Sequence, residues 1–132
     1  MELQVGVKIL LKNKKGEYLV IRRSADKYPK AGAQWEIVGG RIDISSSLVD
    51  NLAREVMEET GLTIVGNIKL ITAQDIFNPN KHIVRLTYLG KGHGLVKLSN
   101  EHTDFKWLSI KEIKLLNPLD PYLKHVLEKF EL

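Results

Sequence analysis

Apolar residues recur at alternate positions, or in short runs, through most of the chain, and turn-forming residues separate these segments. Both patterns are typical of β-strands. The predicted strands are Gln4–Leu11, Tyr18–Arg23, Trp35–Val38, Ile64–Gln74, Ile83–Leu89 and Phe105–Leu108. The segment NKKGE, Asn13–Glu17, predicts a hairpin turn between the first two strands, because Gly16 can adopt positive φ.

Two further segments have helical periodicity. Ser47–Thr60 opens with Ser-x-x-Asp, which is similar to a capping box, and Gly61 follows as a suitable C-terminal cap. Pro121–Phe130 places its apolar residues on one side of a second helix. The order of strands, helix, strands and helix predicts an α+β fold, a layered sandwich with a mixed sheet flanked by helices.

Composition bounds the possibilities. A chain of 132 residues with 43% hydrophobic content is long enough for one ordinary core, so we expect a single domain over residues 1–132. The net charge of +4 suits an anionic partner such as a phosphate ester or a nucleic acid. Cysteine is absent, which excludes disulfides and thiolate metal sites and is consistent with the cytoplasm. No apolar run has membrane-spanning length, and the N-terminus lacks signal-peptide features.

The helix at Ser47–Thr60 carries an unusual concentration of acids in REVMEETGL. Glu59 projects about 20° from Leu52, inside the apolar arc, and Glu55 lies at the margin of that arc. A carboxylate beside a buried stripe costs free energy unless a cation or a hydrogen-bond donor compensates. One alternative is that Arg54 and Lys69 neutralise the acids in surface ion pairs. The residues predicted for the apolar arc are Leu48, Val49, Leu52, Ala53 and Val56.

The segment before this helix favours a second alternative, a metal site. GGRID, Gly39–Asp43, predicts a loop in which two glycines expose main-chain oxygens to a ligand. Carbonyl and carboxylate oxygens together are what Mg²⁺ or Mn²⁺ prefers. A loop and helix that present both are a plausible platform for a divalent cation.

These residues resemble the signature of the Nudix hydrolases, G-x5-E-x7-R-E-U-x-E-E-x-G-U, where U is a bulky apolar residue. The signature runs from Gly40 to Leu62 and departs from the pattern only at Ser46, where the family has Glu. The resemblance extends to flanking segments and so covers most of the chain. The matching positions are Gly40, Arg54, Glu55, Val56, Glu58, Glu59, Gly61 and Leu62, and the flanks are Ile21–Asp26, Trp35–Gly40 and Glu101–Ile113.

The resemblance implies the family's α/β/α sandwich and a Mg²⁺ cofactor, with Mn²⁺ as a substitute. It implies that Glu55 is a metal ligand and candidate base oriented by Arg54, and that Glu101 supplies an extra ligand or base. The implied metal-binding residues are Gly39, Gly40, Glu55, Glu58 and Glu59.

Substrate-binding candidates lie outside the signature. Arg23 ends a predicted strand and has the guanidinium geometry that suits phosphate oxygens. Phe77 and Asp120 are candidates to stack on and hydrogen-bond a base; the alternatives are core packing for Phe77 and a helix N-cap for Asp120. The histidines do not have zinc-like spacing, and we expect them to be surface or packing residues.

Ser46 in place of the family's Glu predicts an active but slow enzyme. The implied Glu would support Arg54 or a metal-bound water, and loss of such support costs about 10–100-fold. Asp43 and Asp50 do not sit at the spacing needed to replace it. On this interpretation Ser46→Glu raises kcat or metal affinity severalfold.

Three classes of function therefore stay open. The first is a Mg²⁺-dependent pyrophosphohydrolase that cleaves a nucleoside diphosphate-linked substrate, a nucleoside triphosphate above all, to monophosphate and pyrophosphate. The second is a Nudix-fold nucleotide-binding module with weak or no catalysis, supported by Ser46. The third, a nucleic-acid binder, rests only on net charge and lacks interleaved aromatic residues. The sequence does not indicate an oligomeric state.

Overall fold

The computed structural model of the chain describes residues 1–27, 29 and 33–131. The strands are β1 (Glu2–Lys12), β2 (Tyr18–Arg23), β3 (Trp35–Glu36), β4 (Val38–Arg41), β5 (Thr63–Asn78), β6 (Lys81–His93) and β7 (His102–Leu108). The helices are α1 (Leu48–Thr60), α2 (Ile110–Ile113) and α3 (Pro121–Lys129). No helix in the described part of the chain has the length and apolar character needed to cross a membrane.

Within the described residues the strands form one seven-stranded sheet. Its main order is β3-β2-β1-β6-β5, with β4 paired to β1 and β7 paired to β2. The long β1–β6 pair is parallel, whereas β4 pairs with β1, β7 with β2, and β5 with β6 in antiparallel fashion. The sheet is therefore mixed, as the order of the sequence elements predicted.

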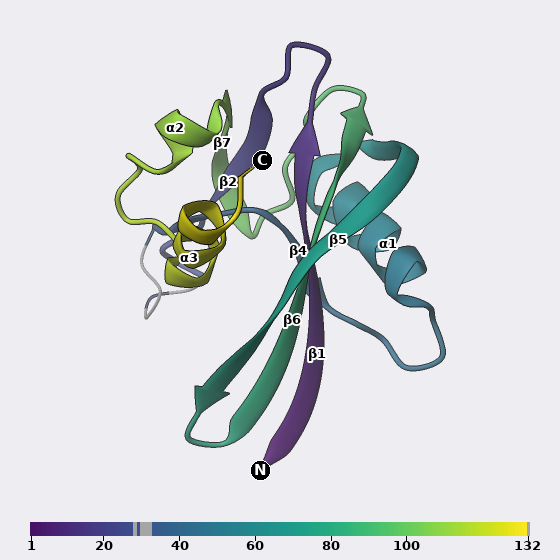
Figure 1. Cartoon of the computed structure of the whole chain (residues 1–132), viewed down its shortest axis with the longest axis vertical. Coiled ribbons are helices and arrows are strands. Elements are labelled where there is room, and N and C mark those ends of the chain that lie inside the picture. Colours follow the sequence, from purple (N-terminus) through teal and green to yellow (C-terminus); the bar gives the residue numbers. More distant parts are fainter. Residues whose placement is uncertain (28, 30–32, 132) are drawn as a thin grey trace.

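Helices cover both faces of this sheet (Figure 1). Successive side chains of a strand point to opposite faces, and β1 uses both: Ile9 and Leu11 join the buried cluster under α1, whereas Leu10 joins the cluster with α2 and α3. All three side chains are fully buried. This arrangement confirms the predicted α+β sandwich, in which α1 occupies one outer layer and α2 and α3 the other.

The strand predicted at Trp35–Val38 is divided in two. β3 pairs with β2, and after Ile37 the chain changes partner, so that β4 pairs with β1. Gly39 and Gly40 consequently lie in a strand opposite Lys8 and Val7, not in the predicted loop, which begins after Arg41. A Cβ at Gly39 would lie 2.0 Å from the carbonyl oxygen of Val7, so only glycine permits this pairing.

Other boundaries differ less. The hairpin turn at Asn13–Glu17 is confirmed: Gly16 has φ 81°, and the amide of Asn13 donates to the carbonyl of Glu17 at 2.9 Å. β5 and β6 extend beyond their predicted ends because they pair as a long hairpin, with two shifts of register, out to Asn78 and Lys81. The short helix α2 was not predicted, although Ser109 and Glu112 form a capping box at its start.

Candidate active site

The ends of α1 are set by its caps, and these bring the acidic residues to its last turns. The Ser47 hydroxyl accepts a hydrogen bond from the amide of Asp50 at 3.0 Å. At the other end Gly61 adopts the left-handed conformation with φ 72°, and its amide donates to the carbonyl of Met57. Both caps agree with the sequence prediction.

The buried face of α1 is only partly the one predicted. Leu52 and Val56 are fully buried as expected, but Val49 is 51% exposed and Ala53 is exposed as well. Asn51, which the predicted apolar arc does not include, is buried at 1% exposure. The buried arc is thus rotated toward Asn51, because the side chain of this residue is satisfied by hydrogen bonds that an apolar periodicity cannot reveal.

The Asn51 amide folds the segment before α1 back onto the helix. Its nitrogen donates to the carbonyls of Ser46 and Ser47 at 3.1 and 2.8 Å. Its oxygen accepts from the amide of Asp43 at 2.7 Å and from Arg54 Nη2 at 3.0 Å. The loop and the guanidinium of Arg54 are therefore held by one side chain.

Arg54 is the centre of an acidic cluster at the edge of the helix. Its Nη1 lies 3.1 Å from Glu55 Oε1 and 3.2 Å from Glu58 Oε2. This part of the ion-pair alternative is confirmed, whereas Lys69 makes no ion pair with these acids among the described residues. Arg54 thus offsets the repulsion between Glu55 and Glu58 and fixes the position of Glu55.

Asp43 contradicts the expectation that no nearby aspartate replaces the missing Glu. Its Oδ2 lies 3.3 Å from Arg54 Nη2. Spacing along the chain does not reveal this contact, because it depends on Asn51 holding the amide of Asp43. Asp43 is therefore in place to support Arg54, whereas Ser46 contacts Asn51 through its main-chain carbonyl.

This contact changes what substitution at the loop should do. We expect Asp43→Asn to lower kcat for the implied hydrolysis about tenfold, the lower end of the roughly 10–100-fold cost of losing a supporting group. Because Asp43 already supports Arg54, Ser46→Glu should change kcat less than twofold. Steady-state kinetics give kcat for both variants. Asp50→Asn, at an exposed position of α1, is the control. If Asp43→Asn leaves kcat unchanged and Ser46→Glu raises kcat severalfold, the interpretation that Ser46 itself slows the enzyme is correct.

Glu55 packs directly against the backbone of β4. A Cβ built on Gly40 would lie 2.8 Å from the carboxyl carbon of Glu55, so the glycine leaves the space that the carboxylate fills. The side chain of Glu55 is 15% exposed, and burial raises its pKa above the ordinary value despite the guanidinium of Arg54. A carboxylate with these properties is suited to bind a cation or to accept a proton.

Glu59 is the most buried acid of the helix. Its Oε1 accepts a hydrogen bond from the amide of Gly39 at 2.9 Å, which ties α1 to β4. Burial raises the pKa of Glu59 to about 7, although Lys8 and the Gly39 amide favour the ionised form. Glu58, by contrast, has a side chain that is 58% exposed. The burial of Glu59 agrees with its predicted place inside the apolar arc.

A buried ion network that the sequence analysis missed is centred on Glu36 of β3. Its Oε1 lies 3.2 Å from Lys8 Nζ and 2.9 Å from Arg23 Nη2, and its Oε2 lies 2.8 Å from His102 Nε2. Although burial opposes the charged form, Lys8 and its neighbours hold the pKa of Glu36 well below its usual range. The available signal was a charged residue between the apolar residues of a predicted strand, at both Lys8 and Glu36.

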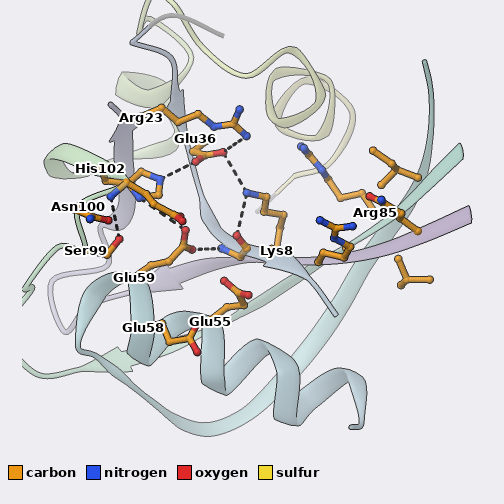
Figure 2. Close-up of a pocket in the computed structure, with 18 residues that line it drawn as sticks. Lys8, Arg23, Glu36, Glu55, Glu58, Glu59, Arg85, Ser99, Asn100 and His102 are labelled. Atoms are coloured by element: carbon orange, nitrogen blue, oxygen red, sulfur yellow. Dashed lines mark hydrogen bonds and ion pairs between the residues drawn. The ribbon is translucent and has the colours of Figure 1, made fainter. Parts of the chain in front are cut away.

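These side chains line one cleft of about 630 Å³ between α1, β1, β4 and the loop before β7 (Figure 2). It brings together Arg23, Gly39, Gly40, Glu55, Glu58, Glu59 and Glu101, all of which the sequence analysis proposed for the site. It adds residues that were not proposed: Lys8, Glu36, Arg85 and His102. His102 was expected at the surface or in simple packing, yet it is a buried member of the cleft.

Of the three candidates that do not line the cleft, Arg54 contacts the cleft residues Glu55 and Glu58, whereas Phe77 and Asp120 lie elsewhere. Phe77 is 66% exposed on β5 and stacks on His82 with ring centroids 4.5 Å apart, so it belongs neither to the cleft nor to the core. Asp120 is buried, caps α3 by accepting from the amide of Tyr122 at 3.1 Å, and pairs with Arg85 Nη1 at 2.6 Å. The cap alternative is therefore confirmed, and Asp120 contacts the cleft residue Arg85 without lining the cleft itself.

The donor atoms of the cleft fit a divalent cation. The carboxylate of Glu59 lies against the main chain of Gly39 and that of Glu55 against Gly40, and Glu58 also lines the cleft. One atom each from Glu59, Glu101 and His102 lies within 4.8 Å of the others. Oxygen-rich sites of this kind suit Mg²⁺ or Mn²⁺.

Comparison with known proteins agrees with this geometry. The family model of the NUDIX domain matches residues 2–130. A MutT-like protein from Streptomyces ambofaciens is 30% identical over 123 residues, which cover 84% of this chain and 73% of that protein.

Solved structures have the same fold. The MutT protein from Methanosarcina mazei Go1 superposes with a TM-score of 0.86 at 30% identity, covering 97% of this chain and 92% of its own. The MutT NUDIX hydrolase from Burkholderia pseudomallei gives a TM-score of 0.84 at 22% identity, covering 99% of this chain and 100% of its own, a likeness of fold.

Proposed function

The chain belongs to the Nudix domain family, whose members hydrolyse phosphoric anhydride bonds in small nucleotide derivatives. On that premise we propose that it converts a nucleoside triphosphate to monophosphate and pyrophosphate with Mg²⁺ as cofactor. The proposal takes residues 1–132 as one catalytic domain with its signature at residues 40–62. Its support is that both buried clusters lie on the two faces of a single sheet.

The observation that carries the proposal is the division of charge within the cleft. Acidic side chains from α1 face a space that basic side chains from the sheet also line. A pyrophosphate link needs both: oxygen ligands that bind a cation, and positive groups that bind phosphate oxygens directly. The basic residues are Lys8 and Arg41 at the β1–β4 pair, Arg23 at the end of β2, and Arg85 on β6.

In this proposal Glu55, Glu58 and Glu59 hold the cation with a main-chain carbonyl of Gly39 or Gly40. A divalent cation bound there would neutralise phosphate oxygens and lower the pKa of a water molecule. Burial of Glu59 supports its assignment as a direct ligand, because a buried carboxylate gains most from a compensating charge.

Proton transfer is assigned to Glu55. Burial raises the pKa of Glu55 and so makes its carboxylate a stronger base, and Arg54 at 3.1 Å holds it in position. Glu101 is the second candidate, since it is exposed and lines the cleft beside His102. In either case the carboxylate takes the proton from the attacking water and releases it to solvent after the anhydride bond breaks.

Phosphate binding by Arg23 gives a direct prediction. The guanidinium has a 27% exposed side chain and lines the cleft, so it can contact phosphate while Glu36 holds it. Arg23→Ala should raise KM about tenfold or more with a smaller change in kcat, because the contact is made in ground and transition states alike. Initial rates over a range of nucleotide concentration measure both constants.

Arg22→Ala is the matched control for this substitution. Arg22 is the preceding residue on the same strand, but its side chain donates to the carbonyl of Ala33 and lies over the Trp35 ring. KM should therefore stay unchanged in Arg22→Ala. A fall in kcat at constant KM for Arg23→Ala would refute the phosphate-binding role of Arg23.

A nucleotide panel tests the proposed function as a whole. The protein is incubated with Mg²⁺ and each of a set of nucleoside triphosphates, diphosphates and diphosphate-linked compounds, and the products are separated and identified. Monophosphate and pyrophosphate from a triphosphate are the expected products. Tight binding without turnover would instead favour the nucleotide-binding module, and turnover of diphosphate-linked compounds alone would exclude triphosphates as the substrate class.

A further inference from the structure

His102, the first residue of β7, lies between two buried carboxylates from different elements. Its side chain is 2% exposed. Nε2 is 2.8 Å from Glu36 Oε2 on β3, and Nδ1 is 3.8 Å from Glu59 Oε2 on α1. Figure 2 shows the ring between these two side chains, beside Ser99 and Asn100.

The hydrogen bonds around Glu36 determine which ring nitrogen carries a proton. Lys8 and Arg23 both bind Oε1 of Glu36, so its carboxylate is ionised and can only accept. The short contact to Oε2 therefore requires Nε2 of His102 to donate. In the neutral ring Nδ1 is then a lone-pair acceptor.

Nδ1 has no hydrogen-bond partner among the described residues. Glu59 Oε2 at 3.8 Å is too far for a hydrogen bond. A buried acceptor left without a donor costs free energy, so such an atom in a cleft indicates a ligand. The cluster also contains Glu101, whose carboxylate lies with Nδ1 and Glu59 within 4.8 Å.

We propose that His102 Nδ1, Glu59 and Glu101 together bind a divalent transition-metal ion, and that Glu36 positions His102 for this purpose. A metal-bound histidine commonly donates its other ring N–H to a carboxylate, as His102 does to Glu36. This proposal rests on the proposed function, which requires a divalent cation in the cleft. The nitrogen ligand lies at the start of β7, outside the signature at residues 40–62.

The consequence is a metal preference different from that of an all-oxygen site. Imidazole nitrogen favours Mn²⁺, Co²⁺ or Zn²⁺ over Mg²⁺, which prefers oxygen ligands and retains its water. His102 should therefore raise the affinity for Mn²⁺ more than that for Mg²⁺. Glu36 should affect the metal affinity by orienting the His102 ring, without being a metal ligand itself.

Pulsed electron paramagnetic resonance of Mn²⁺ bound to the full chain, without nucleotide, tests the assignment. Electron spin-echo modulation should contain a coupling to ¹⁴N in the wild-type protein, and protein labelled with ¹⁵N-histidine should replace it by a ¹⁵N coupling. Bound Mn²⁺ without a nitrogen coupling would overturn the proposal, and so would failure of Mn²⁺ to bind. The labelled wild-type protein keeps the test decisive even if variants fold poorly.

Variants then identify the residue. His102→Gln should abolish the nitrogen coupling and lower Mn²⁺ affinity at least tenfold, while Mg²⁺ affinity, measured by calorimetry, falls less. Glu36→Gln should lower Mn²⁺ affinity by roughly 10–100-fold and keep the nitrogen coupling. His82→Gln, which removes a histidine paired with Asp75 away from the cleft, is the control and should retain both. A coupling that survives in His102→Gln would refute the assignment.

These measurements are independent of turnover. If the nucleotide panel yields no products but the nitrogen coupling is present and depends on His102, the metal assignment stands and the proposed function fails. If nucleotides are hydrolysed but bound Mn²⁺ has no nitrogen coupling, the proposed function stands and the role of His102 is wrong.

Discussion

Glu59→Gln is expected to lower kcat by at least about 100-fold, beyond the roughly 10–100-fold typical for a residue that only supports a ligand. Glutamine keeps the shape of the side chain and the acceptor for the Gly39 amide, which lies 2.9 Å from Oε1. It removes the negative charge with which Glu59 is proposed to bind the cation. The fold should therefore persist while metal binding and hydrolysis are lost.

Thermal unfolding distinguishes this effect from damage to the structure. Without metal, Glu59→Gln should melt at or above the wild-type temperature, because it removes a buried acid whose pKa burial raises to about 7. Saturating Mg²⁺ should raise the wild-type melting temperature by mass action and leave that of the variant unchanged. Asp50→Asn, at an exposed position of the same helix, should behave as wild type. Normal turnover by Glu59→Gln would exclude Glu59 as a ligand.

Gly40→Ala is expected to reduce kcat by a similar factor, about 100-fold or more, through a single added methyl group. That methyl would lie 2.8–2.9 Å from the carboxyl group of Glu55, so the carboxylate must move away from β4 and from Arg54. Misplacement of a reacting group by about 1 Å can cost about 100-fold. The obstacle is the end of a flexible side chain, so the melting temperature should change little.

Two other glycines provide the comparison. At Gly39 an added Cβ would lie 2.0 Å from the carbonyl oxygen of Val7, where φ is also positive at 148°, so Gly39→Ala should lower the melting temperature strongly. At Gly92, outside the cleft, the nearest contact would be an ordinary 3.4 Å to Leu11, and Gly92→Ala should leave kcat unchanged. Wild-type kinetics for Gly40→Ala would show that the position of Glu55 against β4 does not matter.

Local sequence signals predicted the elements that depend on neighbouring residues. The caps at Ser47 and Gly61 set the ends of α1, and the period of two located the long strands of the sheet. The spacing within α1 also placed Glu59 beside the buried Leu52. These features depend on side chains within one or two turns of each other, so a single chain contains enough information.

The parts that were missed depend on contacts between distant segments. Lys8 and Glu36 are 28 residues apart and meet only because β4 pairs with β1 directly after β3 pairs with β2. His102 is 66 residues from Glu36 and reaches it through the pairing of β7 with β2. Phe77 was misjudged for the same reason, because an aromatic residue on an edge hairpin has the same local pattern as one in the core.

Hydrolysis in H₂¹⁸O tests the central claim most directly, which is that water attacks an internal phosphorus of a nucleoside triphosphate at this metal-dependent cleft. The reaction uses wild-type protein, Mg²⁺ and the triphosphate that the panel identifies as the best substrate, and mass spectrometry locates the label. The account predicts one ¹⁸O atom in either the monophosphate or the pyrophosphate, never in both, and no reaction in excess chelator. Orthophosphate with nucleoside diphosphate as the products, or full turnover in chelator, would contradict it.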